Sequence, residues 1–194
     1  MNLIVWNCRG ALKPKFQDHV HDLVRQYDLA IFVVMETRIG GDRARDISNK
    51  LPFDDAFHTN TIRRKGGLWL LWDSNRVEVS HLASSEQEIH STIKVCASKF
   101  SWILFVVYAS PRSAERHVLW SNLSNVADLH NMPWVIAVDF NEPLNDADKF
   151  GGRVVSVNWS LLFKECLDKC NMVDLGFSGL RFTWTNWKEV QGLI

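Results

Sequence analysis

An acid and an amide stand two residues apart directly after an apolar run. The run from Trp134 to Val138 is followed by Asp139, Phe140 and Asn141. Such a run, bounded by turn residues, is typical of a strand buried on both faces, and residues two apart on a strand point to the same side. A carboxylate can bind a hard cation or accept a proton from water, and an amide can donate to a phosphate oxygen. The pair indicates hydrolysis of a phosphate ester, and an Asx turn after the strand is the alternative explanation.

Three further polar residues end apolar runs in the same way. They are Asn7, Glu36 and Tyr108. A glutamate directly after seven apolar residues is costly to bury unless it is paired or bound to a metal. If the ends of these strands meet at one edge, they form a hydrophilic pocket with two carboxylates. That composition is expected of a site for Mg²⁺ and a phosphodiester.

The elements that must position these residues alternate along the chain. Period-two alternation in residues 77–79 and 89–95 indicates half-buried antiparallel strands. Further strands are expected at 172–175 and 179–185. Helices are expected, from apolar residues at three- and four-residue spacing, in segments 14–27, 42–50, 112–129 and 159–170. The pattern predicts an α/β fold in which two sheets pack face to face and are covered by helices, within a single domain spanning residues 1–194.

Composition narrows the class of protein. Lys and Arg together number 22, as do Asp and Glu, which argues against nucleic-acid binding by bulk charge. The four cysteines match no zinc or disulfide pattern, so free thiols in a reducing compartment are expected. No apolar run is long enough to span a bilayer.

Two local groups of basic residues are candidates for contacts with backbone phosphates. Arg63, Arg64 and Lys65 precede two glycines and a strand, where charge and backbone could approach a phosphate. Arg112 and Arg116 stand at the start of an expected helix, where a cation opposes the helix dipole. A basic hairpin turn and a solvated surface are the alternatives.

Taken together, several collinear motifs identify a family. The sequence resembles the endonuclease/exonuclease/phosphatase superfamily, which has the DNase I-like four-layer α/β/β/α fold. Within it, the sequence most resembles the N-terminal endonuclease domain of plant LINE-type retroelement proteins. The matching pieces are Trp6-Asn-Cys-Arg-Gly10, Met35-Glu-Thr37, Gly66-Gly-Leu68, Tyr108-x-x-Pro111, Trp134-x-x-x-x-Asp-Phe-Asn141, Lys149-x-Gly-Gly152, Val173-Asp-Leu-Gly176 and Phe182-Thr-Trp184.

The resemblance implies a role for each polar residue. Glu36 is then the main ligand of Mg²⁺, for which Mn²⁺ is a substitute. Asp139 orients or deprotonates the attacking water, Asn7 and Asn141 position water, metal and phosphate, and Tyr108 hydrogen-bonds the phosphate. The expected substrate is nucleic acid, with DNA favoured over RNA, and the expected location is the nucleus or cytoplasm.

One departure from the family pattern leaves two functions open. Relatives carry a later Ser-Asp-His strand, and none of the seven histidines here matches it. We therefore expect a domain without its last strands and a weakened enzyme, because losing a general acid–base partner typically removes about two to four orders of magnitude of rate. The alternative is a non-catalytic, retroelement-derived binding or regulatory protein. It would act through a homodimer or a protein partner at the uncovered C-terminal sheet edge.

Overall fold

The computed structural model describes most of the chain as two compact units. Unit 1 consists of Met1–Ser110 and Met132–Phe140, and unit 2 of Pro111–Asn131 and Asn141–Ile194. The described residues are 1–61, 66–141, 143–144, 148, 157–176 and 178–179. Each unit is treated separately below.

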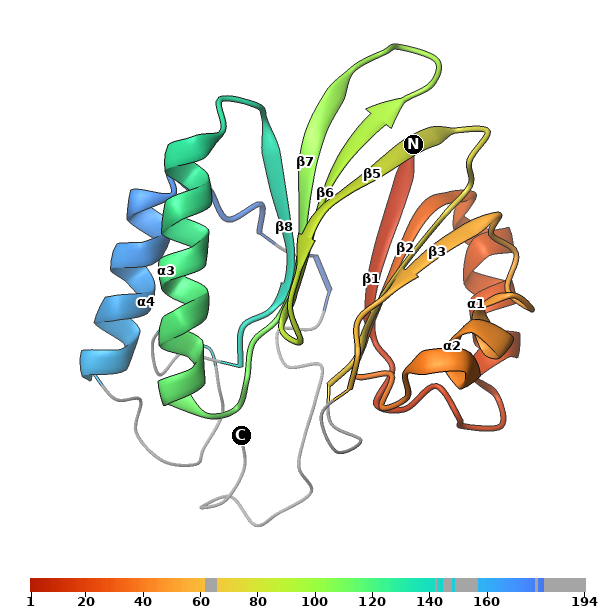
Figure 1. Ribbon diagram of the computed structural model, residues 1–194, viewed down its shortest axis with the longest axis horizontal. Coiled ribbons are helices and arrows are strands. Elements are labelled where there is room, and N and C mark those ends of the chain that lie inside the picture. Colours follow the sequence, from red (N-terminus) through yellow and green to blue (C-terminus); the bar gives the residue numbers. More distant parts are fainter. Residues whose placement is uncertain (62–65, 142, 145–147, 149–156, 177, 180–194) are drawn as a thin grey trace. The chain divides into compact units, whose positions relative to one another are not determined.

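Unit 1 contains two four-stranded sheets (Figure 1). The first has the order β1-β2-β4-β3, with strands Asn2–Asn7, Leu29–Met35, Leu68–Trp72 and Asp55–His58 in that order. The second has the order β5-β6-β7-β8, with strands Val77–Ser84, Glu88–Val95, Ser101–Tyr108 and Trp134–Asp139. The predicted α/β class with two sheets is confirmed.

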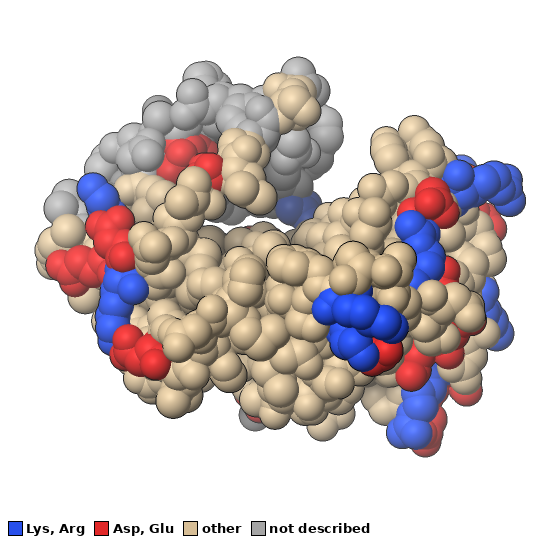
Figure 2. All heavy atoms as spheres, turned by 90° about the horizontal axis from the view of Figure 1, so that it is seen from above, with Lys and Arg blue, Asp and Glu red and all other residues tan. Residues whose placement is uncertain are grey.

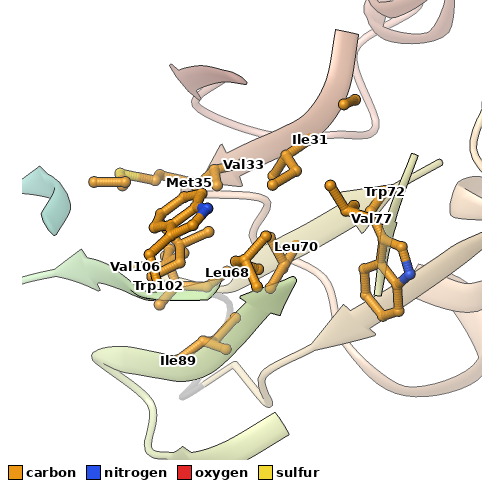
Figure 3. Close-up of a cluster of buried hydrophobic side chains, with 14 residues drawn as sticks. Ile31, Val33, Met35, Leu68, Leu70, Trp72, Val77, Ile89, Trp102 and Val106 are labelled. Carbon is orange, nitrogen blue, oxygen red and sulfur yellow. The ribbon is translucent and has the colours of Figure 1, made fainter. Parts of the chain in front are cut away.

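The central strands of the first sheet are apolar throughout because both of their faces are covered. Every residue of β2 and β4 is buried. Ile31, Val33 and Leu70 point towards the second sheet and pack against residues such as Ile89 and Val106 (Figure 3). Burial on both sides removes the alternation that a half-exposed strand would show.

Helices α1 (Phe16–Tyr27) and α2 (Gly41–Ser48) cover the other face of the first sheet. Phe16 and Val20 of α1 and Ala44 of α2 are buried there in one apolar cluster with residues of β2 and β4. Three- and four-residue spacing gives α1 its single apolar stripe. The first sheet therefore packs against the two helices on one face and against the second sheet on the other.

Two parallel strand pairs, one in each sheet, prepare the site. β1 runs parallel to β2, and Asn7 is in register with Met35. β7 runs parallel to β8, and Tyr108 is in register with Asp139. Parallel strands end at the same edge, so the polar residues that close these runs come together in pairs.

Unit 2 contains two helices that pack on each other. They are α3 (Ser113–Leu129) and α4 (Val157–Lys169), and the rings of Trp120 and Phe163 stack at a centroid distance of 4.8 Å. The thiol of Cys166 in α4 donates to the carbonyl oxygen of Trp120. No described helix in either unit is long and apolar enough to cross a membrane.

The last two strands expected from the sequence have different outcomes. Residues 172–175 form no strand, and Val173 and Leu175 are 79% and 89% exposed. The prediction at 172–175 is wrong because an apolar side chain indicates a strand only when a neighbouring strand and a core exist to receive it. The strand expected at 179–185 lies almost entirely outside the described residues.

Candidate active site

Four of the polar residues predicted from the sequence meet at one end of the two sheets. The side-chain amide of Asn7 donates to Glu36 Oε1 at 3.1 Å and to Asp139 Oδ2 at 2.9 Å. The hydroxyl of Tyr108 donates to Glu36 Oε1 at 2.9 Å. Each of the two sheets contributes two of these residues. One amide therefore links two carboxylates that are separated by more than a hundred residues of sequence.

The Glu36 carboxylate is held in its charged form. Its side chain is 14% exposed, and burial by itself raises the pKa of a carboxyl group. Hydrogen bonds from Arg38, Asn7 and Tyr108, together with the charge of Arg38, outweigh burial and place the pKa of Glu36 below its ordinary value. An ionised, mostly buried carboxylate is a strong ligand for a hard cation.

The backbone of the loop that carries Glu36 is unusual. Glu36 and Arg38 both have positive φ, at 52° and 61°. The left-handed conformation costs a residue with a side chain about 1–2 kcal/mol, so the surrounding structure must enforce it. The backbone N–H groups of Gly10 and Ala11 donate to the carbonyl oxygens of Glu36 and Thr37 at 2.8 and 3.0 Å.

A second turn holds the same loop from the opposite strand. The N–H groups of Thr37 and Arg38 donate to the carbonyl oxygens of Gly67 and Gly66 at 3.2 and 2.9 Å. Gly67 has a φ of 89°, and a Cβ atom there would lie 2.4 Å from Thr37 Oγ1. We refer to residues 36–38 as the Glu36 loop. Gly66 and Gly67 thus hold this loop through their carbonyl oxygens.

The donor set suits a hard divalent cation. Glu36 and Asp139 supply carboxylate oxygens, and Asn7 lies between them with an amide oxygen that accepts from the backbone N–H of Arg9 at 3.3 Å. Magnesium binds to one or two carboxylates and takes its remaining ligands from water and substrate. Among the described residues, no group of three or more His, Cys, Asp and Glu side chains is placed to hold a metal ion.

The remaining predicted site residues belong to unit 2 or to the residues that the structure does not describe. Asn141 follows Asp139 by two residues, has a φ of 49° and belongs to unit 2. In the same unit, Arg112 pairs with Glu115 at 2.8 Å, and Arg116 is only 6% exposed. Residues 63–65, which include both arginines of the first basic group, lie outside the described residues.

Sequence reasoning missed one member of the site. The guanidinium of Arg38 donates to Glu36 Oε2 at 2.8 Å, and its side chain is 50% exposed. Period-two alternation gives no signal for it, because Glu36 and Arg38 follow the end of β2 at Met35 and are not in a strand. The two left-handed residues that aim both side chains at the same place have no sequence signature.

Three histidines of unit 1 make contacts with residues other than the group of four. His58 is hydrogen-bonded to Ser48 Oγ, and His90 is buried with Glu88, at 3.0 Å in both cases. His81 stacks on a phenylalanine ring. These contacts belong to the core and to its borders.

Solved structures of known proteins share this fold at low sequence identity. An AP endonuclease from Leishmania major is 12% identical, with 89% of this chain and 67% of that chain covered at a TM-score of 0.69. The endonuclease domain of TRAS1, a telomere-specific non-LTR retrotransposon, is 12% identical. The match covers 96% of this chain and 77% of that chain, with a TM-score of 0.66. The human Nocturnin catalytic domain is 19% identical, with a TM-score of 0.53. The match covers 73% of this chain and 65% of that chain, so this chain spans less than two thirds of that structure.

A comparison with curated proteins finds no significant match. The family described as "Endonuclease/Exonuclease/phosphatase family" matches residues 4–192. That range contains all four residues of the hydrogen-bonded group and nearly the whole sequence. The chain therefore belongs to the endonuclease/exonuclease/phosphatase family.

Proposed function

We propose that the chain is a metal-dependent phosphodiesterase that cleaves nucleic acid, with DNA favoured over RNA. The observation that carries the proposal is the Asn7 amide that joins the carboxylates of Glu36 and Asp139, with Tyr108 on the same Glu36 oxygen. Membership of a family of nucleases and phosphatases supports hydrolysis of a phosphate ester. Two of the similar structures, those of the AP endonuclease and the TRAS1 domain, are endonucleases by name.

Each residue then has a distinct task. Glu36 holds Mg²⁺ or Mn²⁺, which supplies charge stabilisation for the phosphoryl oxygens when it is bound. Asp139 accepts a proton from the attacking water, and Asn7 fixes the distance between the two carboxylates. The hydroxyl of Tyr108 donates its one hydrogen to Glu36 in the free site. When substrate binds, the same hydrogen would turn from Glu36 to a phosphate oxygen. Asn141, two residues beyond Asp139, is proposed as a further donor to the phosphate.

Arg63, Arg64, Lys65, Arg112 and Arg116 remain proposed contacts to backbone phosphates. Replacing the first three together should weaken DNA binding and reduce its salt dependence.

A nicking assay on supercoiled plasmid tests the proposal. We expect Mg²⁺-dependent nicking by the wild type and its loss, by at least about a hundredfold, in Glu36→Gln and Asp139→Asn. Asp46→Asn is the matched control, because Asp46 is an exposed carboxylate on α2. Undiminished nicking in both site variants would contradict the proposal, and a parallel assay on single-stranded RNA decides between the two substrates.

The second candidate is a non-catalytic binding protein that self-associates or takes a protein partner. The balanced charge favours it. On the face in Figure 2, Lys and Arg side chains lie among Asp and Glu side chains and form no continuous basic surface. Among the described strands, β1 and β3 end the first sheet and β5 and β8 end the second. The edge of β8, the last of these strands in the sequence, is the proposed contact. Sedimentation that shows a dimer, combined with no nicking, would favour this candidate.

A further inference from the structure

Arg38 contacts the group of four through Glu36, and neither the sequence motifs nor the proposed reaction accounts for it. Its guanidinium lies on Glu36 Oε2, while Asn7 and Tyr108 both donate to Oε1. Both oxygens of the carboxylate thus already accept hydrogen bonds within the chain. A cation that binds Glu36 must share the carboxylate with these donors or displace one of them.

The three donors differ in how readily they can leave. Asn7 is tied to a second carboxylate, and Tyr108 lies at the end of a buried strand in register with Asp139. The Arg38 side chain is half exposed and reaches Glu36 through a flexible stem. It is also the only positive charge among the three, so it alone is repelled by an arriving cation.

The backbone keeps Arg38 in the site whether or not it touches Glu36. Its N–H is bonded to the Gly66 carbonyl oxygen, and its φ of 61° is enforced by the turns on either side of the Glu36 loop. Strain at an ordered, non-glycine residue indicates a functional constraint on where its side chain points. A guanidinium released from Glu36 therefore stays at the rim of the site, where it can donate to an anionic ligand.

We propose that Arg38 competes with the divalent cation for Glu36 and so sets the metal concentration at which the site becomes loaded. The inference rests on the proposed function, because it takes Glu36 as the metal ligand. In this view Arg38 is a positioning residue. It occupies Glu36 Oε2 until the cation binds, and it then turns towards the phosphodiester. Both partners of the exchange are single, named groups, so the idea can be tested without any cleavage.

Manganese binding, followed by electron paramagnetic resonance of free Mn²⁺, measures the competition directly. Arg38→Met keeps the stem and removes the charge, and we expect it to bind Mn²⁺ about three- to tenfold more tightly than the wild type, the scale of a partly exposed ion pair. Arg38→Lys keeps the charge and should remain within about twofold of the wild type. Arg45→Met is the matched control, because Arg45 pairs with Asp42 on the exposed face of α2.

Each outcome has a fixed meaning. Equal or weaker Mn²⁺ binding by Arg38→Met overturns the inference, as does an equal gain in Arg45→Met. Binding by Arg38→Met when the wild type shows none supports it, and absence of binding in both overturns it. Cleavage that depends on Glu36 and Asp139, together with unchanged metal affinity in Arg38→Met, removes this inference and leaves the proposed function standing.

A second measurement uses the unaltered side chain. In protein labelled with ¹⁵N-arginine, the side-chain Nε signal of Arg38, assigned by its absence in Arg38→Lys, should shift as Mg²⁺ is added. The signal of Arg45 should stay in place. A stationary Arg38 signal at saturating Mg²⁺ would show that the guanidinium remains on Glu36, which contradicts the exchange.

Discussion

At the scale of single residues, the site depends on the Glu36 carboxylate, whose two oxygen atoms accept hydrogen bonds from three neighbours. Glu36 Oε1 accepts from both Asn7 and Tyr108, and Oε2 accepts from Arg38. Charge-assisted hydrogen bonds of this kind are about twice as strong as neutral ones, and they favour the ionised carboxylate. The protonation of Glu36 is therefore sensitive to the loss of any one donor.

Tyr108→Phe removes one donor and little else. Because a donor to the charged form is lost, the pKa of Glu36 should rise from its lowered value towards the ordinary one. Glu36 is ionised above its pKa and becomes protonated as the pH falls through it. Because the pKa is higher in the variant, the acid limb of its pH–rate profile should move to higher pH. We also expect a fall in rate of about tenfold to a hundredfold.

The control for this prediction is Tyr27→Phe, since Tyr27 is the only other tyrosine and is 46% exposed at the end of α1. Its profile should overlay that of the wild type. An acid limb that stays in place in Tyr108→Phe would show that the hydroxyl does not hold Glu36 in solution.

At the scale of elements, the Glu36 loop is placed by two turns that lie far apart in the sequence. The turn after β1 bonds it on one side, and the turn before β4 bonds it on the other. Apart from Asn7, neither β1 nor β4 contains a residue of the proposed site, yet the turns next to them determine where Glu36 points. This division explains why the loop can adopt two left-handed residues in three.

Gly67→Ala should disturb this arrangement more than its size suggests. The new Cβ atom would lie 2.4 Å from Thr37 Oγ1, at a φ that side chains disfavour. We expect a loss of about 1–3 kcal/mol in the free energy of unfolding and a clear loss of metal affinity, measured by urea denaturation and Mn²⁺ titration.

Gly41→Ala separates backbone strain from steric clash. Gly41 also has positive φ, at 61°, but a Cβ atom there meets nothing within 4 Å. Gly41→Ala should lower the free energy of unfolding by about 1 kcal/mol and leave metal binding unchanged. Equal effects of the two substitutions would mean that contact with Thr37 does not position the loop.

These elements show how far the sequence predicts the site. The apolar runs and their polar ends locate Asn7, Glu36, Tyr108 and Asp139, because parallel strands bring their carboxyl ends to one edge. The role of Arg38 could not be predicted, since it depends on backbone angles that only the two surrounding turns enforce. Strand β3 was also missed, because its residues Asp55–His58 form a strand only through pairing with β4.

At the scale of the whole molecule, stability responds to histidines that the site does not use. Burial of His58 against α2, together with the charge of Arg45, lowers its pKa. The unfolded chain therefore takes up a proton more readily than the folded one. The contribution of His58 to the free energy of unfolding is fully present above the pKa of the unfolded chain, about 6.5. It is lost as the pH falls through that value towards the lower pKa of the folded protein.

His58→Gln should flatten this part of the stability profile. Glutamine can keep a hydrogen bond to Ser48 but does not titrate. The free energy of unfolding, measured by urea denaturation between about pH 8 and pH 5, should fall less steeply in the variant than in the wild type. His21→Gln, at an exposed position on α1, should follow the wild type, and identical slopes in all three proteins would refute the assignment.

The bond between Asn7 and Asp139 spans 132 residues of sequence. During synthesis the ribosome releases Asn7, Glu36 and Tyr108 well before it releases Asp139. A chain that has not yet added β8 to its second sheet cannot complete the group, however well its first sheet has formed. The group of four polar residues is thus completed in a single late step, once β8 has joined the second sheet.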